Sequence, residues 1–301
     1  MTTLTREDYA RLMEVRLRAP EEMRQALTTR RRRPLVGEDG NLLLVAADHT
    51  ARGMLAVGTD PLAVADRFTL LERLTTALSQ PEVDGVLASA DVLEELAVLG
   101  MLDDRLAIGT MNRGGIIGAD WELDDRLTAY DPAHVEEYGL DGGKLLLRLE
   151  DTDPGVAATI ELAAALTTDL ADRRLLCLIE PLPYLKDETG RARLDPSLER
   201  LVKAVAVASG LGASSAYSWL KLPVVPEMDV VAGATSMPIL MLGGDPGTEA
   251  ERVFGLWRNA MAMPNVRGLV AGRALLYPND ADVVGAIRTA ADFVHPTGET
   301  S

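Results

Sequence analysis

The segment from residue 175 to residue 225 contains two apolar runs, LLCLIEPL (175–182) and YSWLKLPVV (217–225), with the helical pattern PSLERLVKAVAVAS (196–209) between them. Neither run alternates strictly between apolar and polar residues, as expected for strands that are buried on both faces. Two strands joined through a helix form a βαβ unit, in which the strands are parallel and the crossover is right-handed. This segment therefore predicts a parallel sheet with helices packed against it.

The same pattern covers the chain from residue 41 onward. The other apolar runs lie at 42–48, 83–89, 105–112, 142–149, 238–244 and 266–276, and the other helical patterns lie at 60–80, 152–173 and 248–263. The last helix opens with Thr248 and Glu251 at the spacing of a capping box, whereas the Gly- and Asp-rich residues 113–141 give the weakest helix prediction. Eight βα units in roughly 250 residues match a closed (β/α)8 TIM barrel. An open doubly wound sheet is the alternative, which the lack of a G-x-G-x-x-G turn after the first strand disfavours.

The first 40 residues precede the barrel and are predicted to form a helical extension, so that the barrel domain would span residues 41–301. Residues 1–34 carry nine Arg against five Asp and Glu. The run Arg30–Arg33 is either a nucleic-acid or anion patch or the solvated, cation-rich end of a helix that Pro34 stops. We favour the second interpretation, since a cationic last turn complements the helix dipole.

Composition excludes several classes of protein. The net charge of −16 repels a polyanion, so no nucleic-acid partner is expected. No apolar stretch reaches the length of about eighteen residues that a membrane span needs, and the amino terminus lacks the apolar core of a secretory signal. The single Cys177 lies in an apolar run and allows no intramolecular disulfide. We expect a cytoplasmic protein, forming a homo-oligomer, with no membrane partner.

Charged residues and glycines gather at the predicted carboxyl ends of the strands, where barrel enzymes carry their chemistry. Two groups follow from this rule. A lysine and carboxylates that converge in one cleft perturb each other's ionisation, which favours a catalytic site over a satisfied polar layer. Glycine-rich loops after the last two strands, with one arginine, favour a phosphate site over plain tight turns. The candidates are Asp48, His49, Arg52, Arg113, Lys144, Arg148, Glu180, Lys221, Gly243, Gly244, Gly272 and Arg273.

Lys221 raises a chemical question, because an ammonium group is costly inside an apolar strand. Of the 30 basic residues, only four are lysines, and Lys144 lies in a second strand, GGKLLLRLE (142–150). Apolar neighbours such as Trp219, together with a nearby ammonium group on Lys144, would favour the neutral amine. A neutral amine can form a Schiff base with a ketone or aldehyde, whereas arginine never yields a free nucleophile.

We therefore interpret Lys221 as the nucleophile of a Schiff-base reaction, with Glu180 or Asp48 as the proton shuttle. The alternative is a structural lysine in a salt bridge, whose tail extends out of the barrel. Two other functions stay open: a barrel isomerase or epimerase that uses Glu180 and Lys221 without a covalent step, and a non-catalytic barrel that binds a sugar phosphate, or a partner through residues 1–40. Metal-dependent aldol cleavage is disfavoured, since a zinc site would need clustered histidines and the chain has only His49, His134 and His295. No cofactor is expected.

The ordered set AADHTARG, GGKLLLRLE, LLCLIEPLPY, WLKLPV, MLGGDPG and VAGRALLYP resembles the class I aldolases over about residues 41–280. It is similar to tagatose-bisphosphate, archaeal-type fructose-bisphosphate and deoxyribose-phosphate aldolases. More narrowly, it resembles an actinobacterial (β/α)8 aldolase-like family linked with inositol breakdown. The resemblance implies Lys221 as the Schiff-base lysine, Lys144 as an assisting lysine, Glu180 as acid/base and Asp48 as the carboxylate after strand one. It also implies a phosphate held by Gly243, Gly244, Gly272 and Arg273.

Two residues depart from the pattern of the relatives. His49 stands where many of them have Gln, and Arg148 follows Lys144 where an aromatic pair is more common; both are expected to line the substrate cavity. The inositol route implies 2-deoxy-5-keto-gluconate 6-phosphate as substrate, split into dihydroxyacetone phosphate and malonate semialdehyde. The extra Arg148 would suit the carboxylate of that substrate. The expected ligand is thus a phosphorylated sugar or sugar acid.

Overall fold

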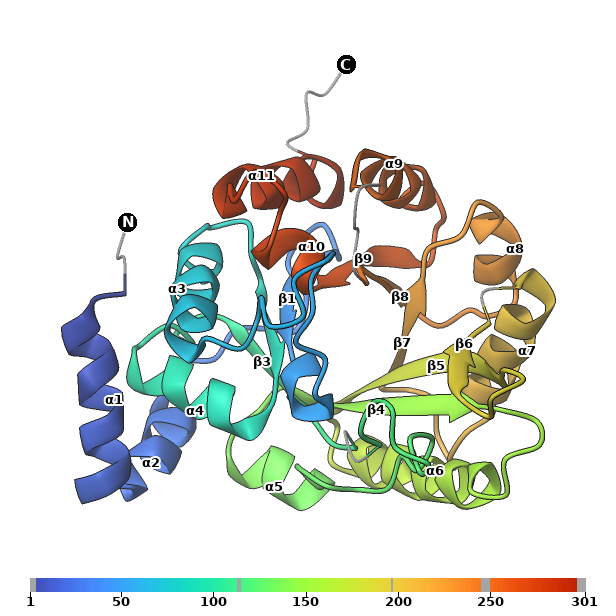
Figure 1. Ribbon diagram of the computed structural model, residues 1–301, viewed down its shortest axis with the longest axis horizontal. Coiled ribbons are helices and arrows are strands. Elements are labelled where there is room, and N and C mark those ends of the chain that lie inside the picture. Colours follow the sequence, from blue (N-terminus) through green and yellow to red (C-terminus); the bar gives the residue numbers. More distant parts are fainter. Residues whose placement is uncertain (1–3, 113–114, 196, 245–249, 297–301) are drawn as a thin grey trace.

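The computed structural model describes residues 4–112, 115–195, 197–244 and 250–296, and in these residues eight parallel strands close into a barrel (Figure 1). Neighbouring barrel strands pair in chain order, and the pairing of β9 with β1 closes the ring. The prediction of a (β/α)8 TIM barrel is confirmed. The barrel strands are β1 (Leu42–Ala47), β2 (Gly85–Ala88), β3 (Leu106–Thr110), β4 (Gly142–Leu149), β5 (Leu176–Lys186), β7 (Ser218–Pro223), β8 (Ile239–Leu242) and β9 (Val266–Ala271).

Helices surround the barrel (Figure 1). They are α3 (Arg67–Leu78), α4 (Ala90–Val98), α5 (Pro132–Glu137), α6 (Val156–Asp172), α7 (Leu198–Ser209), α8 (Met228–Gly233), α9 (Ala250–Ala260), α10 (Arg273–Leu276) and α11 (Val283–Val294). The helix predicted at 60–80 is shorter than expected, because the Asp66 side chain caps α3 by accepting from the amide of Thr69. The predicted capping residue Thr248 lies outside the described residues. None of the described helices has the length and apolar character that a membrane span would need.

Two strand boundaries differ from the prediction by more than two residues. The run 266–276 was expected to be one strand, but β9 ends at Ala271 and α10 begins at Arg273. The fifth strand was expected to end at 182, but β5 continues to Lys186 and folds back on the short antiparallel strand β6 (Ala192–Leu194). The resulting β5–β6 hairpin stands above the barrel rim. Apolar content alone marks neither change. The residues of α10 are nearly as buried as those of β9, and β5 continues past 182 into residues that are only partly buried.

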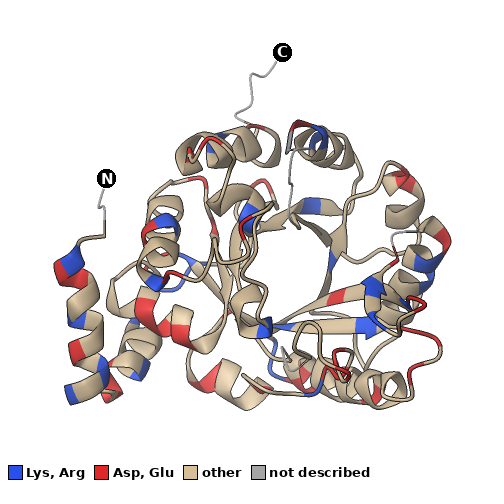
Figure 2. Cartoon of the chain, viewed as in Figure 1, with Lys and Arg blue, Asp and Glu red and all other residues tan. Residues whose placement is uncertain are grey.

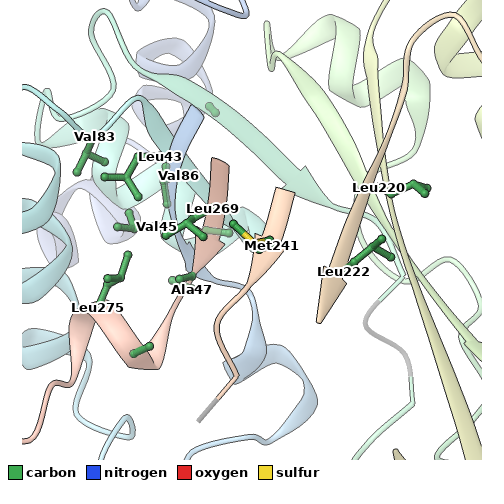
Figure 3. Close-up of a cluster of buried hydrophobic side chains, with 14 of the residues drawn as sticks. Leu43, Val45, Ala47, Val83, Val86, Leu220, Leu222, Met241, Leu269 and Leu275 are labelled. Carbon is green, nitrogen blue, oxygen red and sulfur yellow. The ribbon is translucent and has the colours of Figure 1, made fainter. Parts of the chain in front are cut away.

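The core has one layer outside the strands and one layer inside them. Outside, Leu43, Val45 and Ala47 of β1 pack with side chains such as Val86 and Leu275 (Figure 3). Inside, the strands contribute the alternate residues Leu42, Leu44, Ala46, Leu87, Leu106, Ile108, Leu176, Leu178, Leu240 and Val270. These side chains fill the lower barrel, because side chains on a strand point to one face at every second position. Two residues further along the same faces stand Asp48, Thr110 and Glu180, so that a polar layer covers the apolar plug.

Two further helices precede the barrel, α1 (Arg6–Arg18) and α2 (Glu21–Thr29). They lie at the side of the molecule, where α2 packs against α4 (Figure 1). Thr5 begins α1 with a full capping box, in which Asp8 bonds back to the Thr5 amide. Both helices bury one apolar stripe, which includes Leu12 and Leu27.

The arginine run after α2 is not a solvated helix end. The helix stops at Thr29, and the Arg30 side chain is only 2% exposed, with its guanidinium 2.7 Å from Asp141. Arg33 pairs with Asp84, Arg32 pairs with Asp141 as well, and Arg31 pairs with the acidic residues 103 and 104. Asp84 and Asp141 stand just before β2 and β4 and also accept strand amides. Buried carboxylates in this position need a countercharge, which the run supplies.

His295, which follows α11, joins this cluster of charges at the amino-terminal end of the barrel. Its Nδ1 lies 2.6 Å from Asp39 Oδ2, and its Nε2 lies 3.0 Å from Asp84 Oδ2. Burial acts to lower the pKa of His295, but hydrogen bonds and charge from Asp84 and Asp39 outweigh it and raise the pKa above 6.5. Burial acts to raise the pKa of Asp84, but hydrogen bonds from His295, the Leu43 amide and Arg33 outweigh it and lower the pKa.

We expect His295→Gln to destabilise the protein more in mild acid than in base. Because the pKa of His295 is higher in the folded than in the unfolded protein, its protonated form contributes its full stabilisation at a pH below the pKa of the unfolded state. This contribution disappears as the pH rises through the pKa of the folded state. Denaturant unfolding at about pH 5.5 and at about pH 9 measures the difference, with Asp84 ionised at both values. An equal loss of unfolding free energy at the two pH values would contradict this role.

Candidate active site

Four ionisable side chains meet in the upper part of the barrel interior, and each belongs to or directly follows a different strand. Asp48 directly follows β1, and Lys144, Glu180 and Lys221 lie within β4, β5 and β7. Figure 2 shows charged positions within β4 and β5, although most of the strand length is uncharged. Ile179 of β5 pairs with Leu220 of β7, so the next residues, Glu180 and Lys221, lie side by side. Their inward direction follows from the period of two that begins with the apolar plug.

Glu180 bridges the two lysines. Its Oε2 forms a short ion pair with Lys144 Nζ, and its Oε1 lies 3.3 Å from Lys221 Nζ. Lys144 Nζ also donates to Asp48 Oδ2 at 3.3 Å, and the same oxygen accepts from Thr110 at 3.4 Å. The exposed fractions are 0% for Lys144, 1% for Asp48, 4% for Lys221 and 6% for Glu180. Two amines and two carboxyl groups are thus held in a nearly dry layer, where electrostatic interactions are stronger than in water.

The four side chains stand in different relations to a cavity of about 300 Å³ at the barrel mouth. Asp48, Glu180 and Lys221 line this cavity, whereas Lys144 is not among its described lining residues and lies fully buried behind them. A ligand in the cavity can therefore reach the amine of Lys221 directly. Lys144 contacts two of the lining residues, Asp48 and Glu180.

Glycines form the wall of the cavity after β8 and β9. Gly243, Gly244, Gly272 and Arg273, the residues that the sequence analysis assigned to a phosphate, all line it. A Cβ at position 272 would stand 2.6 Å from the Ala46 carbonyl oxygen, and Gly244 has a φ of +52°, so neither position suits a larger residue. Arg273 donates to the Ala56 carbonyl at 3.0 Å. This wall exposes backbone and one guanidinium to a ligand.

His49 and Arg52 also line the cavity, from the 3₁₀ turn η1 (His49–Arg52) that follows β1. The Arg52 guanidinium is 3.0 Å from Glu122 Oε1 and donates to the Gly115 carbonyl. Its charge is therefore balanced by a carboxylate of the loop between β3 and α5. Sequence reasoning missed Glu122, because a single acid in a Gly- and Asp-rich loop carries no periodic signal.

Arg148 is not where the sequence analysis expected it. It was predicted to line the substrate cavity, but it is not among the described lining residues and is fully buried. Its guanidinium binds both oxygens of Asp125 and lies near Glu122. Burial acts to lower the pKa of Arg148, but hydrogen bonds and charge from Asp125 outweigh it and raise the pKa. The acid that pairs with Arg148, Asp125, lies in the preceding loop. No local sequence pattern indicates this ion pair.

The remaining predicted site residue, Arg113, lies outside the described residues. Sequence reasoning missed five residues of the cavity lining besides Ala46 and Val270: Met54, Leu182, Tyr184, Leu194 and Leu242. Tyr184 and Leu194 belong to the β5–β6 hairpin, which was not predicted. Within the described ranges, no group of three or more His, Cys, Asp and Glu side chains is placed to hold a metal ion.

A family model described as Cgl0159-like matches residues 40–291. The crystal structure of Cgl0159 from Corynebacterium glutamicum is similar over 97% of this chain and 98% of that chain, with 44% identity and a TM-score of 0.94. A comparison with curated protein sequences found no match.

More distant solved structures share the fold. An archaeal fructose 1,6-bisphosphate aldolase aligns over 90% of this chain and 98% of that chain, with 16% identity and a TM-score of 0.66. A second archaeal structure, in which the catalytic Lys is covalently bound to the carbinolamine intermediate of the substrate, aligns over 90% and 99%, with 17% identity and a TM-score of 0.66. At this identity the likeness establishes the barrel fold.

Proposed function

We propose that this chain, which belongs to the Cgl0159-like family, is a class I aldolase, a lyase that cleaves a phosphorylated ketose or keto sugar acid through an imine on Lys221. The observation that carries the proposal is the Glu180 carboxylate, held between Lys144 and Lys221 at the floor of the mouth cavity. A nucleophile within reach of an acid/base, which is itself oriented by a third group, is the arrangement that covalent catalysis needs.

The reaction follows from these positions. The Lys221 amine attacks the ketone carbon, and the carbonyl oxygen leaves as water after Glu180 has supplied a proton, which gives a protonated imine. Removal of the proton from the hydroxyl group on the β carbon breaks the adjacent carbon–carbon bond. The aldehyde leaves, and the electron pair of the broken bond moves into the imine to form an enamine. Protonation of the enamine carbon and addition of water then release the ketone and restore the amine.

Each charged residue has a part in this scheme. Glu180 is assigned the proton transfers at the imine, since its Oε1 lies 3.3 Å from the Lys221 nitrogen. Asp48 lines the cavity and is assigned the hydroxyl proton of the bond that breaks. Lys144 contacts both carboxylates and keeps them oriented from behind. The glycine wall and Arg273 are assigned the phosphate, since backbone amides and a guanidinium suit its oxygens.

The inositol-route substrate, 2-deoxy-5-keto-gluconate 6-phosphate, is a narrower candidate within this proposal. Its cleavage would release malonate semialdehyde, and the carboxylate of that product was expected to contact Arg148. Because Arg148 is bound to Asp125, that support is lost, and we limit the proposal to the phosphorylated class.

Borohydride trapping tests the covalent step. We expect incubation with dihydroxyacetone phosphate and borohydride to leave a stable adduct that peptide mass mapping places on Lys221, because the imine is reduced to a secondary amine. A non-covalent isomerase or epimerase, or a barrel that only binds a sugar phosphate, would give no adduct. An adduct confined to Lys186 or Lys203, which are the more exposed lysines, would also sink the proposal.

A further inference from the structure

The β5–β6 hairpin gives the cavity a wall that the glycine loops do not provide. Beyond the barrel rim, Tyr184 pairs with Leu194, Leu185 with Arg193 and Lys186 with Ala192 in antiparallel register. Opposite residues of an antiparallel pair share a face, and the faces alternate along the strands. Tyr184 and Leu194 therefore share the face that lines the cavity, while Leu185 and Arg193 share the other.

The two hairpin side chains that line the cavity, Tyr184 and Leu194, carry no charge. Lys186, the next residue on the same face, is not among the described lining residues, and its amine lies 2.9 Å from Asp153. Below Tyr184 on the same strand, Leu182 continues the lining, two residues above Glu180. The Tyr184 ring lies over the Arg148 guanidinium, with 5.5 Å between the guanidinium carbon and the ring centroid. Since Arg148 is anchored on Asp125, this cation–π contact fixes the ring without presenting a free cation to the cavity.

The order of strands places the hairpin and the glycine wall on different sides of the reactive amine. Around the barrel, β7 lies between β5 and β8, and β9 follows β8. Lys221 on β7 thus has the hairpin on one side and the loops after β8 and β9 on the other. A ketose bound to the Lys221 nitrogen, with its phosphate at the glycine wall, can extend its other half toward the hairpin.

Resting on the proposed function, we propose that Tyr184 and Leu194 form the subsite for the substrate half that leaves as the aldehyde, and that they select an uncharged hydroxyaldehyde. Among the substrates considered above, this subsite favours a phosphorylated ketose over a keto sugar acid. Among the ketoses, it favours a monophosphate over a bisphosphate. A phosphate or carboxylate against this wall would lose water without gaining a cation. A hydroxyaldehyde can contact Leu194 through carbon and bond to the Tyr184 hydroxyl through oxygen.

The test runs the reaction in the direction of synthesis, with dihydroxyacetone phosphate as the donor. The acceptors are glyceraldehyde, glyceraldehyde 3-phosphate and malonate semialdehyde. We expect kcat/KM for glyceraldehyde to exceed that for either charged acceptor by at least about tenfold. In Leu194→Arg, the ratio of glyceraldehyde 3-phosphate to glyceraldehyde should rise about tenfold, because the new guanidinium meets the phosphate. Leu194 is 43% exposed, so the fold tolerates this change.

Leu185→Arg is the matched control, since it makes the same substitution on the opposite face of the hairpin. It should leave the acceptor ratios unchanged. Borohydride trapping of the donor on Lys221 is measured in all three proteins. If the adduct forms but the wild-type protein prefers a charged acceptor, or if Leu185→Arg shifts the ratio as much as Leu194→Arg, the inference fails and the aldolase proposal stands. If no adduct forms and no acceptor reacts, both fail together.

Discussion

Replacing Lys221 by methionine is expected to abolish the borohydride adduct and to lower kcat for cleavage by at least about 10⁴-fold, the scale seen when a covalent nucleophile is removed. Methionine keeps an unbranched side chain in the same apolar strand but has no amine, so no imine can form. Glu180 keeps its ion pair with Lys144 in this variant. The measurements are peptide mass mapping after trapping and the initial rate of cleavage of a ketose phosphate.

Lys203→Met is the matched control, because it removes an exposed lysine of α7 whose amine lies 2.8 Å from Asp151. It should retain both the adduct and the rate. Thermal unfolding of the Lys221→Met protein shows whether it folds. A folded Lys221→Met protein with a rate within tenfold of the wild type would rule out the covalent mechanism, even if the barrel binds sugar phosphates.

The barrel could be predicted from the sequence because its strands are short, apolar and buried on both faces. Runs such as 42–48 and 142–149 indicate buried parallel strands, because a parallel strand covered by helices needs apolar residues on both faces. The end of β9 could not be placed in this way, because the residues of α10 are as apolar as the strand before it. The β5–β6 hairpin was missed for a different reason. It is held by backbone pairing beyond the barrel rim, where its residues are not fully buried and give no apolar run.

The site was predictable where strand ends and the period of two decide the geometry. Lys144, Glu180 and Lys221 lie on the inward face of their strands, and the barrel brings strand ends together without any further information. Arg148 lies on the same inward face, but the prediction that it lines the cavity was wrong. Its guanidinium is bound to Asp125, which belongs to an irregular loop. The basic run 30–33 shows the same limit, since its acids Asp84 and Asp141 become neighbours only when the barrel closes.

Exchanging Glu180 for glutamine is the second change with a large expected effect, a loss of about 10²- to 10⁴-fold in kcat, the range for a positioned acid/base. Glutamine has the same shape but cannot accept and return a proton, so loss of water from the carbinolamine and hydrolysis of the imine both slow. The Lys221 amine is still present, so prolonged incubation with dihydroxyacetone phosphate and borohydride should still label it. Single-turnover rates and trapping yields over time separate these effects from binding.

Two further variants distinguish a proton-transfer role of Glu180 from a merely structural one. Glu150→Gln removes another buried carboxylate near the carboxyl end of β4, one that accepts from Thr152 and is not among the described residues of the cavity lining. It should leave kcat near the wild-type value. Glu180→Ala opens space beside Lys221, and added formate should restore part of its rate, because a small carboxylate can take over the proton transfer. If Glu180→Gln cleaves at the wild-type rate, or if Glu180→Ala stays folded and formate restores no activity, Glu180 only positions Lys221. The acid/base role would then belong to Asp48, the other carboxylate that lines the cavity and contacts Lys144.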